Sequence, residues 1–494
     1  GTALAWHALR LRLHGLAFPT LGAAWLGLGV GVALHVATFW THQLGIDASR
    51  FAVMGEGLRT TGGFWMPWGD AYDLGHPGWS HHHPPLYPVV LAGFYAAFGF
   101  SEATTHAAAI TLALAAIAAT YLCTRDLMGH PRALVASAAV ALSPMLVQNT
   151  GKAYAESLVL LLFVLTLWCI LRSLRQPAWM LPAGLLAGLG YLAKSSLGGF
   201  FVIAGLAGLA WRLHWRGWKA LRDPWYLGGA AAFASFVAGW ALRNHHLHGT
   251  FASSGHIAAA FSGATADPGA WAVRAAASLA FLLVGGLLLA QGLLPWAARM
   301  RRIRLLGDET DSALWISILL PLLLGTLATG ALWLHEGRLY TNNARYVSIA
   351  IVPAAWLLLR HVRLDEPRTR LRIAASFLLL AVPALVAAGT YAPLPTQASD
   401  ALRDAVQDGD TITFVGVQDA YRYYFDATAD GTRTVHARFL PPERLHEADG
   451  DWVVVQAATP PPRPAEAYEE RLRLEGRVGL EPRTIIILQR VTDA

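Results

Sequence analysis

The sequence predicts an all-α polytopic membrane protein with about eleven transmembrane helices and a small C-terminal soluble α/β domain. The first observation is composition: of 494 residues, 55% are hydrophobic and only 14% are charged, and the mean hydropathy is +0.40. Soluble globular domains contain about a quarter charged residues. The second observation is that the charged residues are distributed unevenly. Together they exclude a single compact water-soluble domain.

Charge divides the chain into two parts. Residues 1–396 contain 27 Lys or Arg and 15 Asp or Glu, whereas residues 397–494 contain 11 and 17. We therefore expect a membrane domain over 1–396 and a water-facing domain over 397–494. The basic residues of the first part lie in short loops between apolar runs, so the positive charge does not predict nucleic-acid binding.

Apolar runs in the first part predict the transmembrane helices, because a helix needs about 20 apolar residues to cross about 30 Å of hydrocarbon. The first run is too long for a cleaved signal peptide. Cys123 and Cys169 lie inside such runs, which indicates buried thiols rather than a disulfide framework. The eleven runs are 20–40, 104–124, 133–148, 157–174, 179–193, 197–212, 225–242, 273–296, 313–334, 346–360 and 373–392.

The loops between these runs fall into two sets that differ in basic charge. One set holds 19 of the 27 Lys and Arg residues, and the positive-inside rule assigns it to the cytoplasm. We predict a multi-pass protein of the cell (inner) membrane, with its N-terminus cytoplasmic and its C-terminal domain and active site outside. The outer basic residues are Arg50, Arg59, Lys152, Lys194, Arg243, Arg274, Arg338 and Arg345.

The segment 42–101 is predicted to be one long outer loop with interfacial helices. The apolar run 84–99 is too short to cross the membrane, and counting it as a span would invert every later loop against the charge bias. Apolar side chains three and four residues apart predict a short helix over 48–60, with Asp47 at its N-cap. Long loops are usually functional, so we expect the chemistry here.

A few charged residues stand where apolar runs meet the outer side. Asp47 follows the first span and Glu156 begins a later one; each fits a carboxylate that stabilises a helix start as well as it fits a functional group. Lys194 interrupts an apolar run and Arg345 opens another. Ionisable residues at membrane depth are functional candidates, and snorkelling of Lys194 to the surface is the alternative.

His81, His82 and His83 precede two prolines and raise the question of a zinc site. Adjacent residues of an extended segment point to opposite faces, and no carboxylate or thiolate lies at ligand spacing. The sequence therefore predicts no metal site here.

Five segments, in order, resemble the C-type (GT-C) membrane glycosyltransferases, in particular the protein-mannosyltransferase-like group that includes the lipid A aminoarabinose transferases. They are DASRFAVMGEGLRTTGGFWMP, HPPLYPVVLAGFYAAFGFSE, YAESLVLLLFVL, GLGYLAKSS and NARYVSIAIVPA, and they extend over roughly residues 20–360. The sequence differs from the family pattern at His83, where many members have Lys, at Glu156, where Asp is common, and at Ser195, where Gly is common. These differences leave the sugar and the acceptor open.

The resemblance implies that 1–396 is a GT-C-type transmembrane glycosyltransferase domain. Its expected reaction moves a sugar from a polyprenyl-phosphate donor to an acceptor hydroxyl, with inversion at the anomeric carbon. A hydroxyl is a poor nucleophile, so a general base is needed, and a lipid phosphate needs cations. The implied residues are Asp47 as base, with Glu156 to orient the acceptor or Asp47; Lys194, Arg345, His83 and Arg338 at the donor phosphate; and Tyr87, Tyr346 and Arg243 at the substrate.

The expected partners are the polyprenyl-phosphate sugar donor, a lipid, glycan or protein acceptor, and membrane lipid, with no nucleic acid. The residues and the resemblance identify no cofactor, and Glu156 leaves a divalent cation open. A transporter or flippase for lipid-linked sugars is the alternative function, and a scaffold for an active soluble domain is a third. A transporter is expected to contain internal repeats and matching broken helices. The sequence contains no internal repeat, and its charged candidates lie at the outer edge.

The C-terminal part is predicted to be a small α/β domain on the outer side. DTITFVGV, DWVVVQA and RTIIILQRV are typical of short buried strands, and helical patterns lie near 398–406 and 464–475. No catalytic constellation is present in this part of the sequence. We expect the domain to cap the outer cavity or to contact the acceptor.

Overall fold

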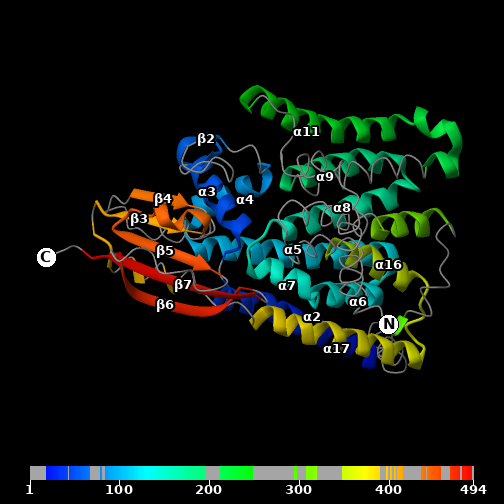
Figure 1. The fold of residues 1–494 in the computed structure, drawn as a ribbon. Coiled ribbons are helices and arrows are strands. Elements are labelled where there is room, and N and C mark those ends of the chain that lie inside the picture. Colours follow the sequence, from blue (N-terminus) through cyan, green and yellow to red (C-terminus); the bar gives the residue numbers. More distant parts are fainter. Residues whose placement is uncertain are drawn as a thin grey trace, which may run out of the picture.

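A computed structural model shows a bundle of helices with a smaller sheet domain at one end (Figure 1). The structure describes most of the apolar part and the strands of the C-terminal part. The described residues are 18–42, 44–66, 78–79, 84–194, 212–248, 294–296, 308–319, 348–389, 397–398, 401–402, 405–407, 409–415, 436–440, 442–457, 468–478 and 481–491.

Among these residues, five helices are long and apolar enough to cross a membrane, and a bent pair makes a sixth if it counts as one span. The fold class is therefore that of a polytopic helical membrane protein. The five are α2 (Phe18–Thr41), α5 (Glu102–Met128), α8 (Glu156–Ser173), α11 (Pro224–His248) and α17 (Pro367–Gly389). The pair is α6 (His130–Ala141) and α7 (Pro144–Gly151).

The predicted run 133–148 is one bent pair rather than a straight helix. The axes of α6 and α7 differ by 55°. Pro144 is the first residue of α7, and Ser143 before it is extended (φ −65°, ψ 116°). The break follows from proline chemistry, because the residue that precedes a proline is disfavoured in the α region.

The number of eleven spans stays a prediction. Nearly all of run 197–212 and nearly all of run 273–296 lie outside the described residues, as does the second half of 313–334. The run near 346–360 corresponds to a short apolar helix over Ser348–Arg360, which includes α16 (Ile351–Arg360).

Two short helices of the predicted outer loop pack against each other at one end of the bundle. They are α3 (Ile46–Thr61) and α4 (Leu86–Phe98). The 13 residues of α4 extend about 20 Å at 1.5 Å per residue, which is too short to cross. The prediction that Asp47 is the N-cap of its helix is wrong. Gly45 holds that position in extended conformation, so Asp47 lies in the first turn.

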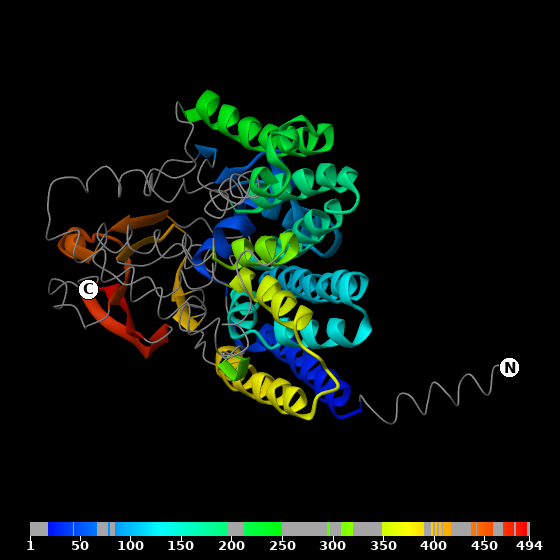
Figure 2. The same ribbon diagram turned by 90° about the vertical axis from the view of Figure 1, so that its right-hand side faces the viewer.

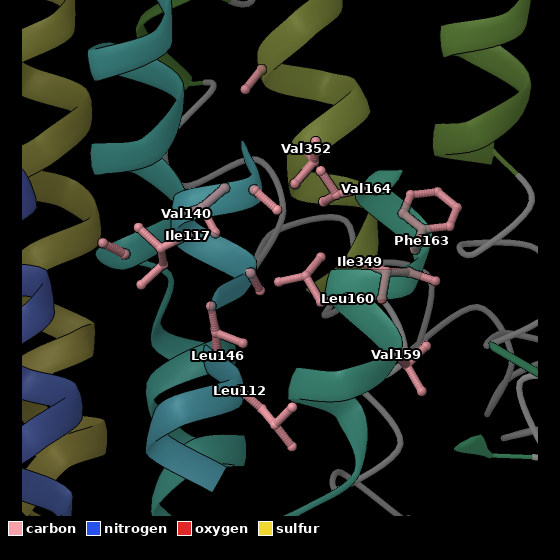
Figure 3. Packing of buried hydrophobic residues seen from close by; sticks show 14 of the residues in the cluster. Leu112, Ile117, Val140, Leu146, Val159, Leu160, Phe163, Val164, Ile349 and Val352 are labelled. Carbon is pink, nitrogen blue, oxygen red and sulfur yellow. The ribbon is translucent and has the colours of Figure 1, made fainter. Parts of the chain in front are cut away.

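The core of the bundle lies where α5, α6, α7, α8 and α16 meet (Figure 3). Trp356 of α16 is fully buried and donates its indole N–H to Thr124 Oγ1 of α5 at 2.6 Å. This bond satisfies a buried donor and ties the two helices together. The apolar side chains that make the contact include Leu112, Ile117, Val140, Leu146, Val159, Leu160, Phe163, Val164, Ile349 and Val352.

Helix α9 (Met180–Ala193) packs closely against α11 through glycine. A Cβ atom added to Gly184 would overlap the backbone of Gly229, and one added to Gly229 would overlap the backbone of Met180. Small residues let helix backbones approach closely in membranes. The contact fixes the position of α9, whose C-cap is Lys194.

The C-terminal part forms a five-stranded sheet with strand order β4-β3-β5-β7-β6. β3 is parallel to both its neighbours, whereas β7 is antiparallel to β5 and β6. The three predicted strands are confirmed as β3, β5 and β7. The strands are β3 (Thr411–Val415), β4 (His436–Leu440), β5 (Trp452–Ala457), β6 (Tyr468–Val478) and β7 (Glu481–Arg490).

The predicted helix near 464–475 is wrong, because the structure has strand β6 there. Leu472 and Leu474 are two residues apart and both pack on the cluster that contains Ile485 and Ile487 of β7. Residues two apart lie on the same face of a strand. The charged side chains between and around the leucines hid this short alternation.

The sheet domain lies beside the end of the bundle that carries α3 (Figures 1 and 2). The ends of α2 and α17 reach the same region, where Thr41 Oγ1 donates to the carbonyl of Ala388 at 2.6 Å. The short strands β1 (Trp65–Met66) and β2 (Gly78–Trp79) pair beyond α3. The sheet domain and helix α3 of the first long loop therefore lie on one side of the bundle.

Candidate functional site

Three charged residues from distant parts of the chain meet at this end of the bundle. The ammonium of Lys194 donates to Oδ2 of Asp47 at 3.1 Å and to Oε1 of Glu156 at 2.7 Å. The side chain of Glu156 is 0% exposed and that of Lys194 is 6% exposed, but that of Asp47 is 21% exposed. Of the two carboxylates, that of Asp47 is therefore the one with access to a substrate.

Each member of this triad lies at the end of a helix. Asp47 is in the first turn of α3, Glu156 is the first residue of α8, and Lys194 directly follows α9 in extended conformation (φ −158°, ψ 106°). Carboxylates at helix N-termini interact favourably with the helix dipole. The two helix starts and one helix end thus converge on a single ion-pair cluster.

The ring of Tyr154 forms a wall of this cluster. Its side chain is 3% exposed, and the ammonium groups of Lys194 and Lys152 lie 5.7 and 6.0 Å from its centroid. These distances are in the range of a cation–π contact. A Cβ atom added to Gly45 would overlap the Tyr154 ring. Glycine at position 45 therefore lets the segment that leads to Asp47 approach the wall.

The turn between α7 and α8 is held by hydrogen bonds from two other elements. The amide of Gly45 donates to the carbonyl of Lys152 at 2.9 Å, and the hydroxyl of Tyr87 on α4 donates to the carbonyl of Ala153 at 2.8 Å. Ala153 has φ +53°, a rare value for a residue with a Cβ. Such backbone costs of order 1–3 kcal/mol and persists where the surroundings hold it.

His42 lies beside the turn, directly after α2. Burial, and to a lesser extent the charge of Lys152, lowers the pKa of His42 to about 4. Its ring occupies the space that a Cβ atom on Gly151 would need. His42 is therefore neutral at pH 7.

The structure brings three of the nine predicted site residues into direct contact: Asp47, Glu156 and Lys194. Tyr87 is fully buried and holds the backbone of Ala153 rather than facing an open surface. Arg243 contacts residues of its own helix: its guanidinium carbon lies 4.6 Å from the centroid of the Trp240 ring, and its Nη1 donates to Asn244 Oδ1 at 2.9 Å. The remaining four lie outside the described residues: His83, Arg338, Arg345 and Tyr346.

In the part of the chain that the structure describes, no group of three His, Cys, Asp or Glu side chains is arranged to hold a metal ion. The positive charge between the two carboxylates comes from Lys194.

Sequence reasoning gave no role to Lys152, Tyr154 and Gly45, which complete the cluster. One signal was available in the sequence. The chain has only three lysines, and two of them, Lys152 and Lys194, flank this site. The role of Gly45 depends on a contact with a residue more than a hundred positions away, so no local pattern reveals it.

Comparison with known proteins supports the interpretation of the sequence. Residues 82–240, about a third of the chain, match the family described as dolichyl-phosphate-mannose-protein mannosyltransferase. The matched stretch includes Tyr87, Glu156 and Lys194. Curated proteins give no match.

Solved structures of the same fold include ArnT and an oligosaccharyltransferase. ArnT from Cupriavidus metallidurans bound to undecaprenyl phosphate has a TM-score of 0.53 and 14% identity, with 94% of this chain and 98% of that chain covered. Its apo state also has a TM-score of 0.53 and 14% identity, with 99% and 98% covered. The oligosaccharyltransferase of Archaeoglobus fulgidus, in complex with Zn and sulfate, has a TM-score of 0.50 and 16% identity, with 88% and 68% covered.

At these low identities the solved structures establish the fold alone. The match covers nearly the whole chain for ArnT. Together with the family match they confirm the resemblance to the GT-C membrane glycosyltransferases.

Proposed function

We propose that this chain, a membrane glycosyltransferase of the C type, moves a sugar from a polyprenyl-phosphate donor to an acceptor hydroxyl with inversion at the anomeric carbon. The observation that carries the proposal is the contact of Lys194 with both Asp47 and Glu156. It gathers a carboxylate for proton transfer and a cation for phosphate in one place. A phosphate-linked lipid donor agrees with the undecaprenyl phosphate bound to ArnT and with the description of the matching family.

Asp47 is the general base in this proposal. The acceptor hydroxyl gives its proton to the Asp47 carboxylate while its oxygen attacks the anomeric carbon. The bond from that carbon to the phosphate oxygen breaks, and the phosphate leaves with the electron pair. Attack opposite the leaving group inverts the anomeric configuration. The partial exposure of Asp47 favours it over Glu156, which is fully buried.

Glu156 acts as a positioning residue. Its 2.7 Å contact with the ammonium of Lys194 is shorter than that of Asp47, and its side chain is wholly enclosed. The buried carboxylate of Glu156 holds the ammonium of Lys194 between itself and the carboxylate of Asp47. Lys194 then holds Asp47 in place and contributes positive charge to the phosphate that leaves.

Further phosphate contacts are proposed for Arg345, Arg338 and His83, and substrate contacts for Tyr346 and Arg243. The site faces the outer side of the inner membrane in this proposal, which rests on the charge asymmetry of the loops.

Because Lys194 supplies the positive charge between the two carboxylates, we propose that transfer needs no divalent cation. Full activity in excess EDTA is the expected result, and loss that Mg²⁺ or Mn²⁺ restores would contradict it.

The experiment that tests this function begins with the lipids of cells that lack the protein. Mass spectrometry of accumulated lipid-linked sugars identifies the donor, and the purified protein is then supplied with that donor and candidate acceptors. The expected product contains the sugar with the anomeric configuration opposite to that of the donor, as measured by NMR. A product with retained configuration would contradict the mechanism. Movement of the intact lipid-linked sugar across proteoliposomes without bond cleavage would favour the flippase.

A further inference from the structure

We propose that Lys152 is a second phosphate-binding residue, and that Lys152 and Lys194 together, on the ring of Tyr154, receive the phosphate of the polyprenyl-phosphate donor. This inference rests on the proposed function and adds a residue to it. It starts from the charge of the site. Asp47, Glu156 and Lys194 together carry a net charge of −1, so the triad alone repels an anionic phosphate.

The leaving phosphate makes this requirement stronger. As a diester the donor phosphate carries one negative charge, and it gains another when the sugar–oxygen bond breaks. A cation beyond the triad must offset that charge. Lys152 provides one, since it shares the Tyr154 ring with Lys194 at nearly equal distances of 6.0 and 5.7 Å.

The position of Lys152 is fixed by the same bonds that position the triad. Its carbonyl accepts the amide of Gly45, two residues before Asp47. The next residue, Ala153, has φ +53° and accepts the hydroxyl of Tyr87. Lys152 therefore lies between the end of α7 and the segment that carries Asp47. The local backbone is held in a costly conformation that presents Lys152 and Tyr154 to one site.

A purely structural role for Lys152 would be to compensate the C-terminal dipole of α7, which it caps. Such an interaction contributes about 0.3–1 kcal/mol at a surface. However, Lys152 is only 9% exposed, and removing an ammonium from water costs several kcal/mol. Its charge also lies beside His42, whose pKa is lowered further by it. The ammonium of Lys152 lies on the Tyr154 ring together with that of Lys194, where both can reach one anionic phosphate.

Binding of two lipids that differ only in phosphate tests the proposal. Undecaprenyl phosphate and undecaprenol are titrated into the purified full-length protein, and binding is measured by native mass spectrometry. The variants are Lys152→Gln, Lys152→Arg and, as a matched control, Lys219→Gln. Lys219 is the third lysine of the chain and lies exposed in the 3₁₀ helix Gly217–Arg222. The thermal unfolding midpoint of each variant is measured alongside.

We expect Lys152→Gln to weaken undecaprenyl phosphate binding about tenfold or more, in keeping with loss of a charge-assisted contact, and to leave undecaprenol binding unchanged. Lys152→Arg should restore most of the affinity, and Lys219→Gln should bind both lipids as the wild type does. Equal weakening for both lipids, or an unchanged affinity for the phosphate in Lys152→Gln, would overturn the role of Lys152 alone. A wild-type protein that does not prefer the phosphate over the alcohol would overturn the proposed donor as well.

Discussion

Lys194 and Asp47 are 147 residues apart in the sequence, yet Nζ of the lysine lies 3.1 Å from Oδ2 of the aspartate. Glu156 completes the contact from a third element at 2.7 Å. The site is thus assembled where two helix starts and one helix end meet. Its geometry depends on the packing of α3, α8 and α9 as much as on the three side chains.

Removing Lys194 is expected to destabilise the protein. Lys194→Met leaves two carboxylates close together without their shared cation, and breaking a buried ion pair costs about 3–5 kcal/mol. Thermal unfolding in detergent measures the effect, with Lys219→Met as the exposed control. Combining Lys194→Met with Glu156→Gln should recover part of the loss, since the double variant no longer buries an uncompensated charge. A double variant as unstable as the sum of both single changes would show that the two residues do not interact.

Gly45→Ala is expected to damage the site through sterics alone. Gly45 has an ordinary φ of −73°, so an alanine backbone fits, but its Cβ would overlap the Tyr154 ring. Overpacking of this kind costs about 1–3 kcal/mol, and the displaced ring should lower the transfer rate. Gly29→Ala on α2 is the control, because a Cβ there meets nothing within 4 Å. Wild-type activity in Gly45→Ala would exclude a close fit between the first loop and Tyr154.

We expect the free energy of unfolding to decrease as the pH is lowered, because the pKa of His42 is depressed in the folded protein. Its pKa is about 4 in the folded protein, chiefly because of burial, against 6.5 for the free side chain. Between pH 6.5 and 4, His42 therefore binds a proton in the unfolded chain but stays neutral in the folded protein. Stability is fully present above pH 6.5 and declines as the pH falls through this window, by at most about 3 kcal/mol.

The variant His42→Gln cannot take up that proton, so it isolates the contribution of this side chain from that of titrating carboxylates. Its unfolding free energy should decline less than that of the wild type between pH 6.5 and 4. Parallel curves for the two proteins would mean that His42 titrates normally in the folded state.

The glycine contact between α9 and α11 should be necessary to hold Lys194 in place. Gly229→Ala puts a methyl group against the Met180 carbonyl and should push the helices apart, with lower thermal stability and lower activity. Gly239→Ala, on the same helix, meets nothing within 4 Å and should behave as the wild type. If both variants unfold at the same temperature, the close approach of these helices contributes nothing to stability.

Patterns within a single helix or strand could be predicted from the sequence, whereas contacts between elements could not. The rarity of acidic and lysine residues in the apolar part singled out Asp47, Glu156 and Lys194. Nothing in their spacing showed that Lys194 would pair with both carboxylates. The bonds from Gly45 to Lys152 and from Tyr87 to Ala153 likewise depend on how distant elements pack.

The errors in prediction have the same origin. Gly45 caps α3 in place of Asp47 because its amide bonds to the turn before α8. Residues of β6 have the charge pattern of an exposed helix. The segment is nevertheless a strand, because it pairs with β7 and its Leu472 and Leu474 pack on the same hydrophobic cluster. In each case a long-range partner determined the local structure.

The rate of sugar transfer by Asp47→Asn, measured in a single turnover together with donor binding, tests the central claim most directly. Asparagine keeps the size of the side chain but cannot accept the proton of the acceptor. We predict that donor binding and thermal stability stay close to wild type while the rate falls by about 10²–10⁴-fold, the usual contribution of a general base. Transfer at the wild-type rate in this variant would contradict the account and remove Asp47 from the chemistry.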